Sequence, residues 1–135
     1  MTSVAQKRTF DRNAEAIEAW NGVLFDKFRR FPHIVRDGFG VAGTAALERH
    51  PPPRGARVLD IGCGFGDSTR EIAQWVGAEG EAVGVDAAVR FIEVASREAA
   101  EAGVGNACFA SPTRSWTISA GLTIAHFRAS EQCSS

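Results

Sequence analysis

Three glycines alternate with other residues directly after a short apolar stretch that contains an acid. Residues 58–61 read Val-Leu-Asp-Ile, and glycine follows at positions 62, 64 and 66. Glycines at this spacing let the backbone turn sharply and bring its N–H groups against a ligand with no Cβ in the way. One glycine alone would indicate only a tight turn. Three of them between a strand and a helix favour a nucleotide-type binding loop.

Acids beside this loop restrict the charge of its ligand. A dinucleotide fingerprint has glycine or alanine three residues after its second glycine, where this chain has Asp67. A carboxylate at Asp60 next to a pyrophosphate would cost several kcal/mol at an effective dielectric of about 20. The same carboxylate would attract an ammonium or a sulfonium. We therefore predict S-adenosylmethionine, which carries both cations, no phosphate and a carboxylate for the loop N–H groups, and we disfavour an NAD-dependent oxidoreductase.

Asp86 ends a second apolar stretch, 20 residues after Gly66. An acid at this place in a βαβ unit accepts hydrogen bonds from both ribose hydroxyls of a bound nucleotide. The alternative role for Asp86 is to cap the amino end of the next helix. Because Asp86 accompanies the glycine loop, we favour ribose binding.

Other reactive side chains are better explained without catalysis. Cys63 precedes a helix amino end, which lowers a thiol pKa, but no histidine lies near it and the position needs only a small residue. We therefore name no catalytic residue. We expect Trp20 and Phe28 to form the core of the helical cap rather than an aromatic cage for a sulfonium. His33 is expected at the surface, and Arg29, Arg30 and Arg36 are expected on a solvated face.

The elements that must position this loop follow from periodicity. Apolar residues recur at helical spacing over 13–31, a second helix is expected over 34–50 with glycines that weaken it, and the proline-rich stretch 51–55 cannot continue it. Beyond this linker the pattern predicts βαβαβ, with a capping box formed by Ser68 and Glu71. The expected strands are 57–61, 81–86 and 106–110, and the expected helices are 67–76 and 88–102, ended by Gly77 and Gly103.

This order predicts an α/β fold with a parallel sheet and its ligand crevice at the carboxyl ends of the strands. The composition excludes several other classes. The chain has 135 residues, 44% of them hydrophobic, and a formal net charge of −1, so we expect one globular domain without nucleic acid or membrane partners. Its polar start lacks the core of a signal peptide, and we expect a cytoplasmic protein. Three scattered cysteines predict neither a metal site nor a disulfide.

Two segments resemble a known family. Residues 58–67 (Val-Leu-Asp-Ile-Gly-Cys-Gly-Phe-Gly-Asp) and 83–86 (Val-Gly-Val-Asp) resemble the first and second motifs of class I S-adenosylmethionine-dependent methyltransferases, in particular those similar to ubiquinone/menaquinone-biosynthesis enzymes. Residues 16–22 also resemble a bacterial cap that closes over cofactor and substrate. The resemblance implies a Rossmann-like fold and cofactor contacts from Asp60, from the backbone of Gly62, Cys63 and Gly64, from Asp86 to the ribose, and from Ala87 beneath the adenine.

The resemblance further implies methyl transfer to a small-molecule acceptor by in-line displacement, which requires positioning more than a dedicated base. It ends near Ala110, after three of about seven strands. We therefore expect a cap and linker over 1–53, the cofactor half of the domain over 54–110, and an atypical tail over 111–135. A shifted reading frame of the back-translated tail permits a sequence like the family's continuation. This suggests a frameshift near Ala110, which sequencing the gene would test.

Such a truncated sheet has two expected consequences. Its first strand would leave an apolar, unpaired edge, which is a site of aggregation. The alternative function is a non-catalytic fragment that binds S-adenosylmethionine weakly or not at all. No residue of the sequence identifies the methyl acceptor.

Overall fold

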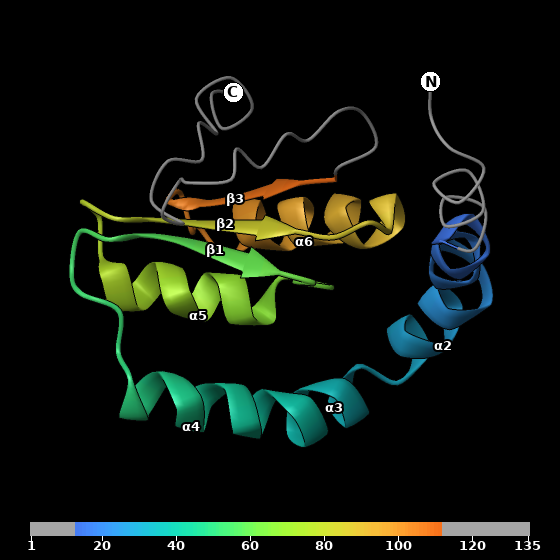
Figure 1. The fold of residues 1–135 in the computed structure, drawn as a ribbon, viewed down its shortest axis with the longest axis horizontal. Coiled ribbons are helices and arrows are strands. Elements are labelled where there is room, and N and C mark those ends of the chain that lie inside the picture. The colour runs from blue at the N-terminus through green and yellow to red at the C-terminus, as the bar shows by residue number, and fades with distance from the viewer. Residues whose placement is uncertain (1–12, 112–135) are drawn as a thin grey trace, which may run out of the picture.

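A three-stranded parallel sheet forms the centre of the computed structural model, which describes residues 13–111 (Figure 1). Strands β1 (Arg57–Ile61), β2 (Glu81–Val85) and β3 (Ala107–Ala110) lie side by side in that order. The register places Asp60 beside Gly84, and Val85 beside Ala110. Because all strands point the same way, their carboxyl ends meet at one edge, which confirms the predicted Rossmann-like βαβαβ order.

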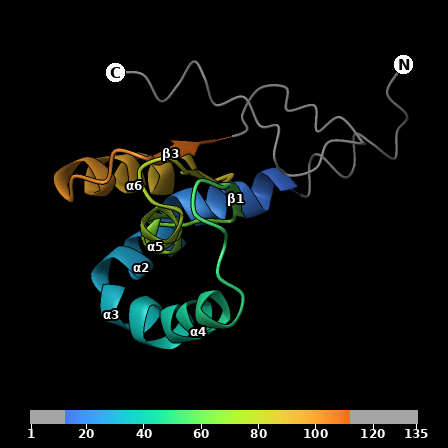
Figure 2. The same ribbon diagram turned by 90° about the vertical axis from the view of Figure 1, so that its left-hand side faces the viewer.

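Helices α5 (Asp67–Val76) and α6 (Val89–Glu101) cover one face of this sheet (Figure 2). Apolar residues of α5 recur at helical spacing, so that Ile72, Ala73 and Val76 are buried together against Ala82 of β2. Gly77, with φ +72°, ends α5 as predicted. Both helices therefore begin at the edge of the sheet where the glycine loop lies.

Helical segments cover residues 13–49 with one break. A helix over 13–19 continues into the π-helical stretch η1 (Trp20–Leu24) and then α2 (Phe25–Arg30). This confirms the predicted helix over 13–31, although Gly22 has non-helical angles (φ −110°, ψ −109°) and distorts it. The second predicted helix begins earlier, at a proline, and comprises α3 (Pro32–Val35), the π-helical η2 (Arg36–Gly40) and α4 (Val41–Arg49).

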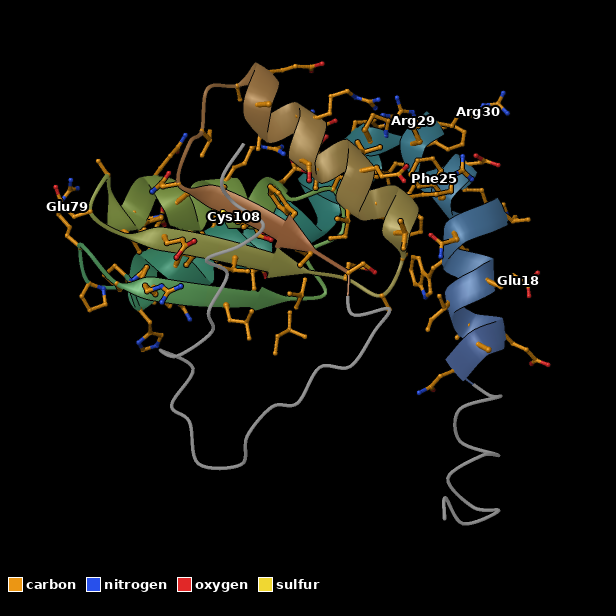
Figure 3. The ribbon with its side chains drawn as sticks, turned by 90° about the horizontal axis from the view of Figure 1, so that it is seen from above. Glu18, Phe25, Arg29, Arg30, Glu79 and Cys108 are labelled. Atoms are coloured by element: carbon orange, nitrogen blue, oxygen red, sulfur yellow. The ribbon has the colours of Figure 1, made fainter. Side chains whose placement is uncertain are left out.

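The two halves of this helical cap contact different helices of the sheet layer. Phe25 of α2 packs against Phe91 of α6, with ring centroids 5.2 Å apart. Figure 3 shows Phe25 turned toward α6, whereas Glu18 points away from the sheet. On the other side α4 lies beneath α5 (Figure 1), where Thr44 donates a hydrogen bond of 3.1 Å to Glu71.

Two expectations from the sequence are wrong. The capping box is absent, because Gly66 is the N-cap of α5 without a side-chain bond, and the partners expected for Ser68 and Glu71 are replaced by Asp60 and Thr44. Cys108 of β3 is disulfide-bonded, contrary to the expectation of reduced thiols, and the other half of that bond lies outside the described residues. The predicted tail over 111–135 also lies outside them, apart from Ser111. No helix among residues 13–111 has the length and apolar character needed to cross a bilayer.

Candidate functional site

The glycine loop between β1 and α5 has the conformation that its sequence predicts. Gly62, Gly64 and Gly66 all have positive φ angles, of +75°, +55° and +81°. A Cβ at Gly62 would meet nothing within 4 Å, and one at Gly64 would meet only Phe91 at 3.9 Å. At Gly66 a Cβ would lie 2.6 Å from the ring of Phe109. The first two glycines therefore leave open space beside the loop, while the third permits close packing of α5 on β3.

Backbone N–H groups of the loop are already hydrogen-bonded within the chain. Gly62 and Cys63 both donate to the carbonyl oxygen of Val85, at 2.7 and 3.1 Å. The N–H of Gly64 donates to Oδ2 of Asp86 at 3.1 Å. These bonds continue the β1–β2 pairing beyond the strand end. The expectation that the loop offers N–H groups to a ligand carboxylate stays a prediction, and in this conformation these three groups have partners within the chain.

Asp60 joins β1 to the amino end of α5. Its Oδ2 accepts hydrogen bonds from the hydroxyls of Ser68, at 2.6 Å, and Thr69, at 2.7 Å. Thr69 is fully buried, so its hydroxyl needs this partner. Asp60 is not among the residues that line the cavity described below. Its contact with a methionine moiety stays a prediction, and its carboxylate has a structural task in this geometry.

Asp86 lies where β2 ends and faces the loop. Its Oδ2 accepts the N–H of Gly64, and its Oδ1 accepts the N–H of Ala88 at 2.9 Å. Helix α6 has Ala88 as its N-cap, without a side-chain cap bond, so the alternative of Asp86 as an N-cap is wrong. Both Asp86 and the exposed Ala87 line the cavity. Their ribose and adenine roles remain predictions that this position permits.

A cavity of about 1230 Å³ adjoins the loop. It lies between the carboxyl ends of β1 and β2 and the helical cap, and it exceeds the roughly 300–1,000 Å³ of common small-molecule sites. Its ionisable lining consists of four acids and one base. The loop residues Gly62, Cys63 and Gly64 lie on its wall, and the charged residues are Arg36, Glu48, Asp67, Glu71 and Asp86.

Aromatic residues of the cap form part of the same wall. Trp20 and Phe28 have ring centroids 5.4 Å apart, and both pack on Phe91. The prediction of cap core is correct for Phe28, which packs against a buried cluster, and wrong for Trp20, which is 43% exposed. Both residues line the cavity. His33 is exposed and packs edge-on against Phe31, outside the cavity wall.

Arg36 is exposed, as the predicted solvated face requires, but it also has ion-pair partners that the sequence did not predict. Its Nε lies 3.3 Å from Asp67, and its guanidinium is 3.9 Å from Glu98. It also lines the cavity. Arg29 and Arg30 agree with the prediction, since both are exposed and point away from the sheet (Figure 3).

Cys63 behaves as a buried thiol. Removal from water raises its pKa from 9.0 to about 12, and the negative charges of Asp60 and Asp86 contribute to the increase. Its side chain is 7% exposed. A thiol that stays protonated is a poor nucleophile, which agrees with the prediction of no catalytic role.

Sequence reasoning missed two supports of the site. Gly84 lies beneath the loop, where a Cβ would come within 2.9 Å of Cys63 and 2.7 Å of Thr69. The sequence signal for this supporting role was the position of Gly84 two residues before Asp86. The hydroxyl residues Ser68 and Thr69 directly follow the loop. Their contact with Asp60 could not be inferred from the sequence, because it depends on how α5 folds back on β1.

Comparison with known proteins finds similarity to methyltransferases. Residues 53–111 match the model of a methyltransferase domain. An aklanonic acid methyltransferase (DauC) from Streptomyces sp. (strain C5) is 41% identical over 68 residues, which are 50% of this chain and 31% of that protein. A demethylmenaquinone methyltransferase from Roseiflexus castenholzii is 36% identical over 83 residues, or 59% of this chain and 29% of that protein.

Solved structures of methyltransferases are also similar to parts of the chain. A protein-L-isoaspartate O-methyltransferase superimposes with a TM-score of 0.49 and 28% identity, over 52% of this chain and 22% of that one. The chain spans about a third of the length of the two sequence relatives. Residues 53–111 are therefore similar to a methyltransferase domain, in agreement with the names of both relatives and with the two motifs that resemble those of class I S-adenosylmethionine-dependent enzymes.

Proposed function

We propose that the cavity beside the glycine loop binds S-adenosylmethionine, and that the protein transfers its methyl group to a small-molecule acceptor. The observation that carries this proposal is the juxtaposition of the open Gly62–Gly64 surface with Asp86 on one cavity wall. Gly62 would have room for a Cβ, so the space above it is available to a ligand. The bound cofactor would supply an electrophilic methyl group on a sulfonium.

The charge of the cavity wall supports a cationic ligand. Four carboxylates and one guanidinium line it, so its field favours an ammonium or sulfonium and opposes a pyrophosphate. The acids that line the cavity are Glu48, Asp67, Glu71 and Asp86, and Asp60, on which the expectation from the sequence rested, is not among them. Oδ2 of Asp60 is engaged by two hydroxyls.

The size of the cavity supports the binding of a second molecule beside the cofactor. Its volume exceeds that of common single-ligand sites, and the aromatic rings of Trp20 and Phe28 provide an apolar wall from the cap. In this arrangement the cap excludes water and orients an acceptor next to the methyl group. Positioning of this kind is the main requirement of a displacement at carbon. Both relatives carry small-molecule names, which supports a small acceptor.

The second candidate is a fragment that binds the cofactor weakly or not at all and has no activity. It is favoured by the coverage of about a third of each relative, because the remaining two thirds of those proteins have no match in this chain.

Calorimetric titration of the purified chain separates these possibilities. Saturable binding of S-adenosylmethionine and S-adenosylhomocysteine without binding of NAD is expected. No saturable binding of any of the three would favour the inert fragment, and a preference for NAD would overturn the charge argument. Methyl transfer to added acceptors is then measured with radiolabelled cofactor.

A further inference from the structure

The carboxylate of the proposed cofactor needs a positively charged or N–H partner, and three N–H groups of the glycine loop are already engaged. The N–H groups of Gly62 and Cys63 already donate to Val85, and that of Gly64 donates to Asp86. Breaking these bonds would detach the loop from β2. A charged donor elsewhere on the cavity wall would bind the carboxylate without breaking them.

Arg36 is the one basic side chain among the described residues that line the cavity. It belongs to η2 of the cap. A guanidinium offers five N–H donors in a planar fork that matches a carboxylate. The remaining ionisable groups of the wall are acids, which would repel the same carboxylate. Charge and geometry thus leave Arg36 as its favourable partner.

The present contacts of Arg36 allow such an exchange at low cost. Its guanidinium is half-exposed, and its ion pairs with Asp67 at 3.3 Å and Glu98 at 3.9 Å are therefore weak. Both acids keep a second partner, because Arg70 lies 2.5 Å from Asp67 and 3.4 Å from Glu98. Turning Arg36 toward a ligand leaves neither acid without a base.

We propose that Arg36 binds the carboxylate of S-adenosylmethionine and so couples cofactor binding to the position of the cap. This inference rests on the proposed function, and it adds a cap residue that selects an amino-acid carboxylate. The ion pairs of Arg36 with Asp67 and Glu98 hold η2 against α5 and α6 before the ligand enters.

Decarboxylated S-adenosylmethionine isolates this contact, because it retains both cations and lacks only the carboxylate. By calorimetry the wild-type chain is expected to bind S-adenosylmethionine about tenfold more tightly than the decarboxylated compound. Arg36→Gln should lose about tenfold affinity for S-adenosylmethionine and change affinity for the decarboxylated compound by less than about twofold. Raising the salt concentration should reduce the wild-type preference.

Arg30→Gln is the matched control, because Arg30 lies in the same cap, points away from the sheet and packs over Phe31 (Figure 3). It should change neither affinity. Equal losses for both ligands in Arg36→Gln would show that Arg36 only holds the cap, and would overturn the inference while the proposed function stands. An unchanged preference would overturn it as well. Failure of the wild-type chain to bind either ligand would refute the proposed function itself, and with it this inference.

Discussion

Asp60 shows how a residue in a binding motif can have its energetic effect in the scaffold. One oxygen accepts two hydroxyls from the first turn of α5. The carboxylate thereby fixes the angle at which the helix leaves the glycine loop. A loss of ligand affinity on mutation would therefore not by itself show direct contact with a ligand.

Asp60→Ala is expected to lower the free energy of unfolding by about 1–3 kcal/mol, because the buried hydroxyl of Thr69 loses its acceptor. Asp60→Asn keeps an acceptor oxygen and should lose less. Urea denaturation followed by circular dichroism measures both changes. Unchanged stability of Asp60→Ala together with lost cofactor affinity would instead assign Asp60 to the ligand.

Cys63 makes stability depend on pH in the alkaline range. The thiol titrates near pH 9.0 in the unfolded chain and at about 12 in the folded one. A raised pKa in the folded state stabilises below pH 9 and loses that contribution as the pH rises toward 12, because the unfolded chain releases the proton first. The free energy of unfolding should therefore fall over this interval, by at most about 1.4 kcal/mol per pH unit from this group.

Cys63→Ala serves as its control and should show a shallower fall between pH 9 and 12, measured by chemical denaturation at each pH. The thiol of the folded wild-type chain should also react slowly with iodoacetamide at pH 8. Rapid alkylation without unfolding would contradict the burial that raises its pKa.

Element boundaries near the sheet are the part of the fold that the sequence predicts best. The helix over 67–76 and the strand over 57–61 were predicted with the observed bounds, because glycines and a proline-rich linker mark them chemically. The π-helical stretches η1 and η2 were not predicted. They depend on how the cap packs over α5 and α6, and single-chain periodicity does not contain that information.

Close packing of α5 against β2 depends on a missing side chain at Gly84. A Cβ there would lie 2.7 Å from Oγ1 of Thr69 and 2.9 Å from both Sγ of Cys63 and the ring of Phe109. Gly84→Ala should therefore cost about 1–3 kcal/mol of stability by overpacking. Gly105→Ala is the matched control, since a Cβ at that position would meet nothing within 4 Å, and it should stay within about 0.5 kcal/mol. Thermal denaturation of both variants checks the difference, and equal midpoints would contradict this packing.

Arg90 adds polar and cation–π contacts to the aromatic packing that holds the cap on α6. Its guanidinium lies 3.9 Å from the ring centroid of Phe25 and donates a 2.8 Å hydrogen bond to the carbonyl oxygen of Asn21. Losing both contacts in Arg90→Ala removes about 1–2 kcal/mol of docking energy. Amide hydrogen exchange over residues 20–30 should accelerate about tenfold, with little change in the sheet.

Arg97→Ala, on an exposed turn of the same helix, controls for the loss of charge and should leave exchange in the cap unchanged. Equal acceleration in the cap and the sheet of Arg90→Ala would show that the cap and sheet unfold as one unit.

At the scale of the molecule, the cavity exists only because distant segments meet. Thr44 and Glu71, which join α4 to α5, are 27 residues apart, and Arg36 is 31 positions before the Asp67 that it contacts. The sequence predicted the loop and Asp86, since each lies at a strand end whose place in the sheet is fixed by topology. It could not predict Arg36 or the cap wall, because no local pattern determines where a helix before the linker will lie.

The edge of the sheet formed by β1 should determine how the chain behaves at high concentration. Within residues 13–111, β1 pairs with β2 on one side only, and Ile61 at its end is 75% exposed. An edge strand presents unpaired N–H and C=O groups that accept another strand, and apolar side chains favour such pairing. We therefore expect self-association that increases with concentration, measured by sedimentation velocity, and light scattering that rises on heating before unfolding is complete. A monomer at all concentrations with one sharp, reversible thermal transition would contradict this expectation, and would mean that the edge of β1 is covered in solution.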